Sequence, residues 1–265
     1  MSGYDGLSSV AVTTNVSGGL KLTDGMTMSY WTITPQSVDT TEMTSMNRLF
    51  CYYGDSATGT MSYPVIDTSN VTDMSNMFYK ELDIGGYLNN DFILNFDTSK
   101  VTTMESMFAY TKTSNFSKYN KFISFVEGLD TSKVTNMHWM FYGYEKGSVS
   151  NSSAFFPKVD SSKATNMQGM FQNSQFKLFP SNFTYNTSAC INMTNIFTSS
   201  GINVDSGSNT FSGILDMCIN CDNTNYEGTK TLYALGFRNS MVSPGYFQYC
   251  SNYQDFLDAG WTIGY

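Results

Sequence analysis

The residues that most often carry out chemistry are scarce in this sequence of 265 residues. His138 is the only histidine, and it occupies a variable position between two methionines, so we expect it to face solvent. Hydrolytic triads need a base, and the chain contains no G-x-S-x-G, H-E-x-x-H or dinucleotide-binding fingerprint. Residues 54–60 (GDSATGT) mimic part of a phosphate loop but lack its lysine, so we interpret them as a plain loop. We therefore predict no enzymatic activity and no cofactor.

The five cysteines are the next candidates for chemistry. Cys218 and Cys221 form a lone C-x-x-C pair. A zinc site would need two further ligands, and the remaining candidates are Cys190, Cys250 and His138. Cys190 replaces a core valine of the repeat described below, which favours structural cysteine over metal binding or redox chemistry. We predict no metal site.

Aspartates form the one regular array of charge. They recur at intervals of 28, 30, 33 and 30 residues, at Asp39, Asp67, Asp97, Asp130 and Asp160. An aspartate before a helix accepts from free N–H groups of the first turn and suits the positive end of the helix dipole. The alternative is a row of Ca²⁺ sites, but Ca²⁺ takes six or more oxygen ligands and each unit supplies about one carboxylate. We favour helix caps.

The aspartates belong to a motif that recurs along most of the chain. Its third copy, residues 96–108, reads FDTSKVTTMESMF, and the pattern is apolar-Asp-Thr-Ser-x-Val-Thr-x-Met-x-x-Met-Phe. Six copies, the last more degraded, occupy residues 38–50, 66–78, 96–108, 129–141, 159–171 and 185–197. A unit repeated at this period indicates a stacked array rather than a single globular core.

Within a copy, the apolar spacing predicts a short helix. Val101, Met104, Met107 and Phe108 lie at i, i+3, i+6 and i+7, which places them on one helix face. The apolar, β-rich runs upstream predict strands at residues 92–96, 122–126, 154–159, 176–179 and, more weakly, 63–66. We therefore expect an α/β fold, a leucine-rich-repeat-like solenoid with a parallel β-sheet on one side and short helices on the other. The predicted core comprises Val71, Met74, Met77, Phe78, Val101, Met104, Met107, Phe108, Val134, Met137, Met140, Phe141, Met167, Met170 and Phe171.

The second copy carries a family resemblance. Residues 67–78, DTSNVTDMSNMF, resemble the repeat of the BspA-like leucine-rich-repeat surface proteins of bacteria. The resemblance covers roughly residues 38–197 and implies an atypical leucine-rich solenoid with a binding or adhesion role. The return segments are longer and more irregular than in that pattern, and there is no secretion or wall-anchor signal. Residues 3–10, GYDGLSSV, and the closing DAGWTI of residues 258–263 resemble segments of bacteriophage tail and fibre proteins and of other proteins with this repeat.

The return segments between copies differ in every unit and are rich in tyrosine. Insertions at one point of a stacked repeat emerge along one edge, and tyrosine offers a large contact area at low entropy cost. That edge is our candidate recognition surface, and its tyrosines are Tyr79, Tyr87, Tyr110, Tyr119, Tyr142 and Tyr144. The alternative, equally open at this point, is that these loops only cover the ends of helices.

Composition and the remaining segments complete the expected organisation. The net charge of −8 and the charged fraction of 14% give no footprint for nucleic acid or for an anionic membrane, and no apolar stretch reaches membrane-spanning length. We expect an N-terminal cap or docking arm at residues 1–30, the repeat solenoid at 31–200 and a C-terminal cap at 201–265. Within the last region, residues 211–217 and 229–237 suggest strands or irregular layers, 252–259 a final helix and 261–265 a last strand.

Together these features predict a non-enzymatic structural or recognition protein. The first hypothesis is a bacteriophage virion component, a tail or head fibre that binds a receptor through the solenoid loops. Its partners would be other virion proteins or a bacterial surface receptor, glycan or protein, and it could form a homo-oligomer. The alternative is a bacterial cell-surface adhesin that binds host or matrix proteins outside the cell.

Overall fold

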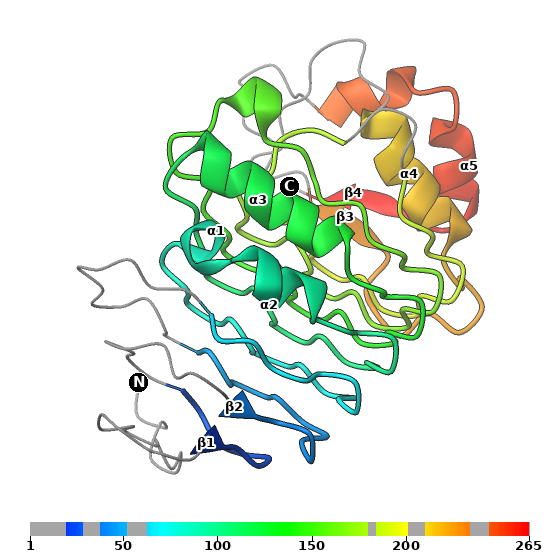
Figure 1. Ribbon diagram of the computed structural model, residues 1–265. Coiled ribbons are helices and arrows are strands. Elements are labelled where there is room, and N and C mark those ends of the chain that lie inside the picture. The colour runs from blue at the N-terminus through cyan, green and yellow to red at the C-terminus, as the bar shows by residue number, and fades with distance from the viewer. Residues whose placement is uncertain are drawn as a thin grey trace, which may run out of the picture.

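The computed structural model describes residues 20–28, 38–51, 63–179, 184–200, 210–233 and 244–264. Most of the expected N-terminal arm and the loop at residues 54–60 lie outside these ranges. The helices are α1 (Ile84–Tyr87), α2 (Asn90–Leu94), α3 (Phe116–Glu127), α4 (Thr210–Asn220) and α5 (Tyr253–Asp258), with 3₁₀ turns η1 (Asn151–Ser153) and η2 (Pro244–Tyr249). The strands are β1 (Leu20–Lys21), β2 (Val38–Asp39), β3 (Thr231–Tyr233) and β4 (Thr262–Gly264) (Figure 1).

Successive copies of the motif lie side by side in parallel register. One residue per copy bridges to its counterpart in the next copy, along the series Ser45, Asp73, Thr103, Asn136, Asn166 and Asn192. Alternate N–H groups then donate to the following copy, as Arg48 does to the Ser75 carbonyl (3.0 Å) and Phe50 to that of Met77 (2.9 Å). The named strands are short and pair in parallel, β1 with β2 and β3 with β4. The backbone of each motif is therefore satisfied mainly by its neighbours in the array.

One phenylalanine per copy forms a continuous column through the interior. The phenylalanine column consists of Phe50, Phe78, Phe108, Phe141, Phe171 and Phe197, whose rings stack at centroid separations of 5.6, 5.5, 5.6, 5.4 and 5.8 Å. Their planes are tilted by only 1–20°. All of the Val, Met and Phe side chains named above as predicted core are buried. The flexible methionines fill the space beside the stacked rings.

The helix predicted inside each motif was wrong. Residues 105–110 form consecutive tight turns, in which Met107 donates to the Met104 carbonyl (3.1 Å) and Ala109 to that of Ser106 (3.0 Å). The N–H groups between these turns donate to the next copy, so the i→i−4 pattern of an α-helix is not available. A Met-x-x-Met turn also directs both methionines inward, which explains why its spacing resembles that of a helix.

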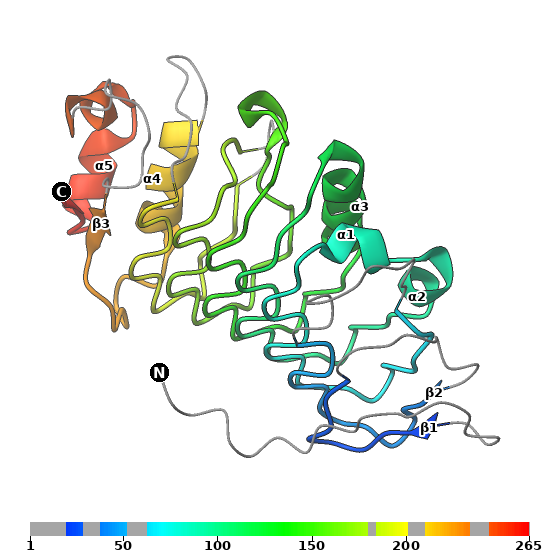
Figure 2. The ribbon, with the colours of Figure 1, turned by 90° about the vertical axis from the view of Figure 1, so that its left-hand side faces the viewer.

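Two segments expected to be strands are helical, and so is one that was expected to be a strand or an irregular layer. Residues 92–96 overlap α2, 122–126 lie in α3, and 211–217 lie in α4. In α3, Tyr119, Phe122, Phe125 and Val126 are buried at helical spacing. Asn115 caps this helix, because its side chain accepts from the Lys118 N–H at 3.1 Å. The helices follow one side of the stack, and Figure 2 shows them along its outer arc.

Buried threonine hydroxyls add a second ladder between copies. Thr40, Thr68 and Thr131 donate to the backbone carbonyls of Asp67, Asp97 and Asp160 at 2.7–2.9 Å. The equivalent hydroxyl of Thr98 is buried without a partner in the described part of the chain. The interval that follows Thr98 is the longest between copies, at 33 residues. The ladder is therefore interrupted where α3 is inserted.

The C-terminal region ends the array with a helix and a strand. α5 and β4 occupy the places where the final helix and last strand were expected, with residue 265 outside the described ranges. Trp261 is buried and donates its indole N–H to Asn223 Oδ1 at 3.1 Å. Among the described residues, no helix has the length and apolar character needed to cross a bilayer. That this region and residues 1–30 act as caps stays a prediction.

Candidate functional site

Among the described residues, all six copies turn one corner and copies two to six turn a second, and both corners have left-handed backbone. The first corner row consists of the second variable residue of each Met-x-x-Met turn, namely Arg48, Asn76, Ser106, Trp139, Gly169 and Asn195. The second corner row lies two residues beyond the column phenylalanine and consists of Lys80, Tyr110, Gly143, Asn173 and Ser199. Glycine and asparagine adopt this conformation readily. Trp139 (φ 54°) and Tyr110 (φ 58°) adopt it at a cost of about 1–3 kcal/mol each.

A glycine in the following copy makes room for each of these two aromatic side chains. A Cβ atom at Gly169 would lie 2.5 Å from Cδ1 of Trp139, and one at Gly143 would lie 2.8 Å from Cδ1 of Tyr110. Each glycine occupies the same corner row as the aromatic residue that it accommodates. The two aromatic side chains therefore pack directly against the glycine backbone of the following copy.

The aromatic residues of three neighbouring copies form one cluster. Tyr110 lies between Tyr79 and Tyr142, with ring centroids 5.6 and 5.0 Å apart and planes inclined by 77° and 70°. Trp139 contacts Tyr142 at 5.4 Å. The ammonium group of Lys80 lies 5.8 Å from the ring centroids of both Tyr79 and Tyr110, a cation–π distance. Edge-to-face packing of this kind orients the rings while leaving part of each in solvent.

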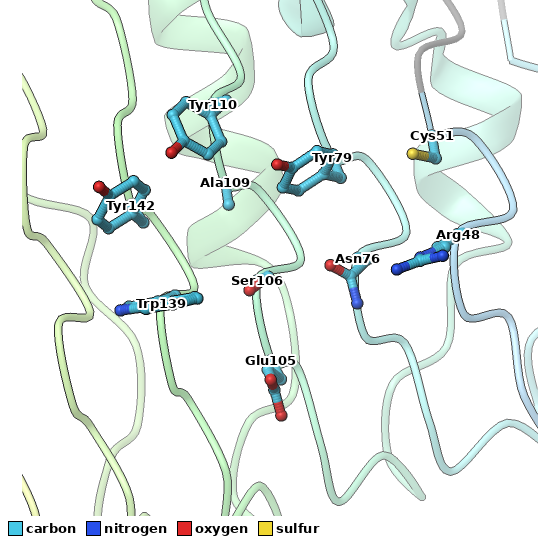
Figure 3. A pocket seen from close by; sticks show the side chains of 10 residues that line it. All are labelled: Arg48, Cys51, Asn76, Tyr79, Glu105, Ser106, Ala109, Tyr110, Trp139 and Tyr142. Carbon is cyan, nitrogen blue, oxygen red and sulfur yellow. The ribbon is translucent and has the colours of Figure 1, made fainter. Parts of the chain in front are cut away.

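These side chains line a hollow of about 330 Å³ on the surface of the first four copies. The hollow is lined by Arg48, Cys51, Asn76, Tyr79, Glu105, Ser106, Ala109, Tyr110, Trp139 and Tyr142. Figure 3 shows the three tyrosines as one row, with Trp139, Ser106, Asn76 and Arg48 as a second row beside it. Tyr110 and Trp139 are 43% and 40% exposed, so a ligand in the hollow would contact both. The size and the mixed aromatic and polar lining are those of a small-molecule or oligomer binding site.

Cys51 lines the hollow, and His138 lies close to it. Burial raises the pKa of the Cys51 thiol to about 12, so it is protonated at neutral pH and a weak nucleophile. His138 was expected to face solvent, but it is mostly covered. Its imidazole stacks on Trp139 at 4.4 Å, and Nδ1 lies 3.3 Å from Glu105 Oε1. Its Nε2 is buried. The imidazole therefore supports Trp139 and Glu105 from behind and does not reach the hollow.

A comparison with protein families places this chain. The model of a family described as "Mycoplasma protein of unknown function, DUF285" matches residues 44–146 and 111–226, which together cover more than half of the sequence. The chain belongs to the DUF285 family. This is a BspA-like repeat family, so the match agrees with that part of the resemblance. A search of the curated proteins found no match. A search of the solved structures also found none.

The tyrosines predicted to form one recognition edge of this DUF285 protein divide into two groups. Tyr79, Tyr110 and Tyr142 come together at the hollow. Tyr119 and Tyr144 are buried, and their hydroxyls bond the Phe155 carbonyl (2.6 Å) and Thr113 Oγ1 (2.9 Å), so including them in a binding surface was wrong. The reason is that their return segments fold back over the core, as α3 does for Tyr119. Tyr87 is half-buried against Tyr63, and burial raises its pKa to about 12.

Sequence reasoning missed several residues of the hollow, above all Trp139, Arg48 and Glu105. All three are variable positions inside the turns of the motif, whereas the predicted binding residues all lie in the return segments between copies. Aligning the copies would have shown a tryptophan and an arginine in a row otherwise occupied by Asn, Ser and Gly. That departure from turn-forming residues was the available signal.

The aspartate series caps turns rather than helices. Oδ1 of Asp39, Asp67, Asp97, Asp130 and Asp160 accepts from the N–H two residues later at 2.8–3.1 Å. This is an Asx turn, and no helix begins there, so the helix-cap assignment was wrong. In the sixth copy Asn186 makes the same bond to Ser188 at 3.0 Å, so the role needs no charge. Among the described residues, no group of three acidic, cysteine or histidine side chains is arranged to hold a metal ion.

The cysteines that sequence reasoning assigned to structural roles lie in apolar surroundings. Cys190, Cys218 and Cys221 are buried, and none of the described cysteines forms a disulfide. Burial raises the pKa of the Cys190 thiol to about 12 and that of Cys221 to about 11. These thiols are therefore protonated at neutral pH, which is unfavourable for metal ligation and thiol exchange.

Proposed function

We propose that this DUF285 protein is a non-enzymatic recognition protein that binds its target at the hollow. The observation that carries the proposal is the presence of Trp139 and Tyr110 at left-handed corners, where Gly, Asn or Ser would serve the backbone better. Strained residues that the fold does not require are characteristic of functional sites. The glycines that accommodate both rings support this, because they adapt the following copies to the aromatic residues.

The array that presents the hollow is, in our proposal, a leucine-rich-repeat-like solenoid. The parallel bridges, the inter-copy hydrogen bonds and the phenylalanine column all favour it. Such arrays expose extended surfaces built from equivalent positions of successive repeats, and recognition is their usual role. The hollow is a surface of this kind, because its lining comes from the same few positions in four copies.

For the biological setting, we propose a bacteriophage virion component that binds a bacterial surface receptor. The terminal segments at residues 3–10 and 258–263 support this setting. A bacterial cell-surface adhesin is the second candidate, supported by the membership of a BspA-like repeat family. Mass spectrometry of purified virions separates the two: the first proposal expects peptides of this chain in the particles, and detection only in bacterial envelopes would contradict it.

Binding itself is tested with labelled full-length protein and intact bacterial cells. We expect Trp139→Asn and Tyr110→Asn each to weaken cell binding at least tenfold, because each removes an aromatic contact from the hollow. Asparagine already occupies both corner rows, at Asn76 and Asn173, so both variants should fold. Phe116→Ala is the matched control, since Phe116 is 51% exposed and does not line the hollow. Equal binding by all four proteins would contradict the proposal.

A further inference from the structure

We infer that the ligand of the hollow is an extended glycan that carries a carboxylate and runs along the direction of stacking. This inference rests on the proposed function and specifies its ligand. The hollow crosses four copies, with Arg48 in the first, Asn76 in the second, Ser106 in the third and Trp139 in the fourth. Neighbouring parallel strands lie about 4.8 Å apart, close to the length of one sugar unit in an extended polysaccharide. Each copy would therefore meet about one sugar ring.

The lining has the chemistry that sugar rings need. One face of a pyranose presents C–H groups that pack on aromatic rings, while its hydroxyl groups form hydrogen bonds with polar side chains. The row of Tyr79, Tyr110 and Tyr142 supplies the aromatic side, and Trp139 lies beside Tyr142 at the fourth-copy end of the other row (Figure 3). Asn76 and Ser106 lie in the opposite row and supply amide and hydroxyl groups. An entirely apolar ligand would leave these polar groups unpaired.

The charge at one end of the hollow selects an anionic ligand. Figure 3 shows the Arg48 guanidinium directed toward Asn76, along the row. Among the described residues, no carboxylate forms an ion pair with Arg48, although the chain has 22 acidic residues. Glu105, the acidic residue of the lining, is already engaged by His138 and by the Asn136 amide at 3.0 Å. A guanidinium binds a carboxylate in a bidentate, planar arrangement, so a sugar carboxylate suits this position.

A peptide bound by strand addition is disfavoured, because the corner backbone has no unused groups. The N–H groups of Arg48, Asn76 and Ser106 donate to the next copy at 2.8–3.0 Å. Their carbonyls accept from the N–H groups of Cys51, Tyr79 and Ala109 at 3.0–3.1 Å. Strand addition depends on free main-chain donors and acceptors. Recognition at the hollow must therefore use side chains, which suits a glycan.

The test titrates full-length protein with two probes, a tetrasaccharide of galacturonic acid and the neutral cellotetraose, and measures heat of binding. We expect the acidic probe to bind at least tenfold more tightly. Arg48→Gln should remove that preference, Trp139→Asn should weaken binding of both probes at least tenfold, and Phe116→Ala should change neither. Equal affinity for both probes would overturn the inference that the ligand carries a carboxylate. A preference for the acidic probe that survives Arg48→Gln would overturn it as well.

The same proteins are then applied to bacterial cells treated with periodate, which cleaves sugar diols, or with protease. Loss of binding after periodate and retention after protease is the expected result. A different result would overturn the inference that the ligand is a glycan: neither tetrasaccharide binds, and protease but not periodate abolishes cell binding. If that cell binding still depends on Trp139, recognition at the hollow stands. If cell binding does not depend on Trp139, the proposed function itself fails.

Discussion

The phenylalanine column and the aromatic cluster of the hollow are built from the same kind of side chain and differ in every other respect. The column places one phenylalanine at the same position of six copies, with nearly parallel rings that are fully buried. The cluster uses tyrosine and tryptophan in only three copies, with inclined rings, partial exposure and, at Tyr110 and Trp139, left-handed backbone. Repetition marks the residues that hold the stack together, and departure from repetition marks the candidate site.

Phe108→Ala would test the column most severely. Removing a fully buried ring between two stacked neighbours should cost about 3–5 kcal/mol in the free energy of unfolding, from lost burial and the cavity left behind. Urea denaturation followed by circular dichroism measures it. Phe116→Ala, which truncates a half-exposed ring on α3, should change stability by less than about 1 kcal/mol. Similar losses in both variants would mean that the column has no special role.

Two equivalent threonines differ in whether their hydroxyl forms a hydrogen bond to the next copy. The Thr68 hydroxyl donates to the Asp97 carbonyl at 2.8 Å and accepts from its N–H at 2.7 Å. Thr68→Val should therefore destabilise the protein by about 1–3 kcal/mol, because buried backbone groups lose their partner. Thr98→Val should be neutral or stabilising, since the Thr98 hydroxyl is buried and unpaired in the described part of the chain. Equal changes in the free energy of unfolding for the two variants would contradict a stabilising role for the threonine hydrogen bonds between copies.

Acid stability should depend weakly on the Asx turns. Hydrogen bonds from the Ser132 hydroxyl and N–H lower the pKa of Asp130 below its usual value. Its stabilising contribution is therefore present above the unfolded pKa of about 3.9 and is lost as the pH falls through the folded value. Asp130→Asn keeps the geometry, as Asn186 shows. We expect it to be at most about 0.5 kcal/mol less stable at pH 7, because the side chain is exposed.

The measurement for Asp130→Asn is urea unfolding at pH 7 and at pH 3. The small difference from the parent protein should shrink between pH 7 and pH 3, because the stabilising contribution of the parent carboxylate declines once the pH falls below the unfolded pKa. A difference that grows as the pH falls would contradict the direction of the pKa shift.

The sequence carries more information about burial than about secondary structure in this protein. The spacing of Met104, Met107 and Phe108 indicates which side chains point inward, but both a helix and a chain of Met-x-x-Met turns satisfy it. Partners thirty residues away decide between them, since alternate N–H groups donate to the next copy. The same limitation applies to α3, whose apolar run fits a strand or a helix until the cap at Asn115 is considered. The hollow required the copies to be aligned, because none of its residues forms a contiguous motif.

In our proposal, the aromatic residues of the hollow are present for binding and are not needed for folding. The most direct test is the free energy of unfolding of Trp139→Asn, measured by urea denaturation. Relief of the left-handed strain should offset the lost ring contacts, so we predict a variant as stable as the parent protein or more stable by about 1 kcal/mol. A loss of more than about 2 kcal/mol would show that Trp139 is a structural residue and would contradict the account.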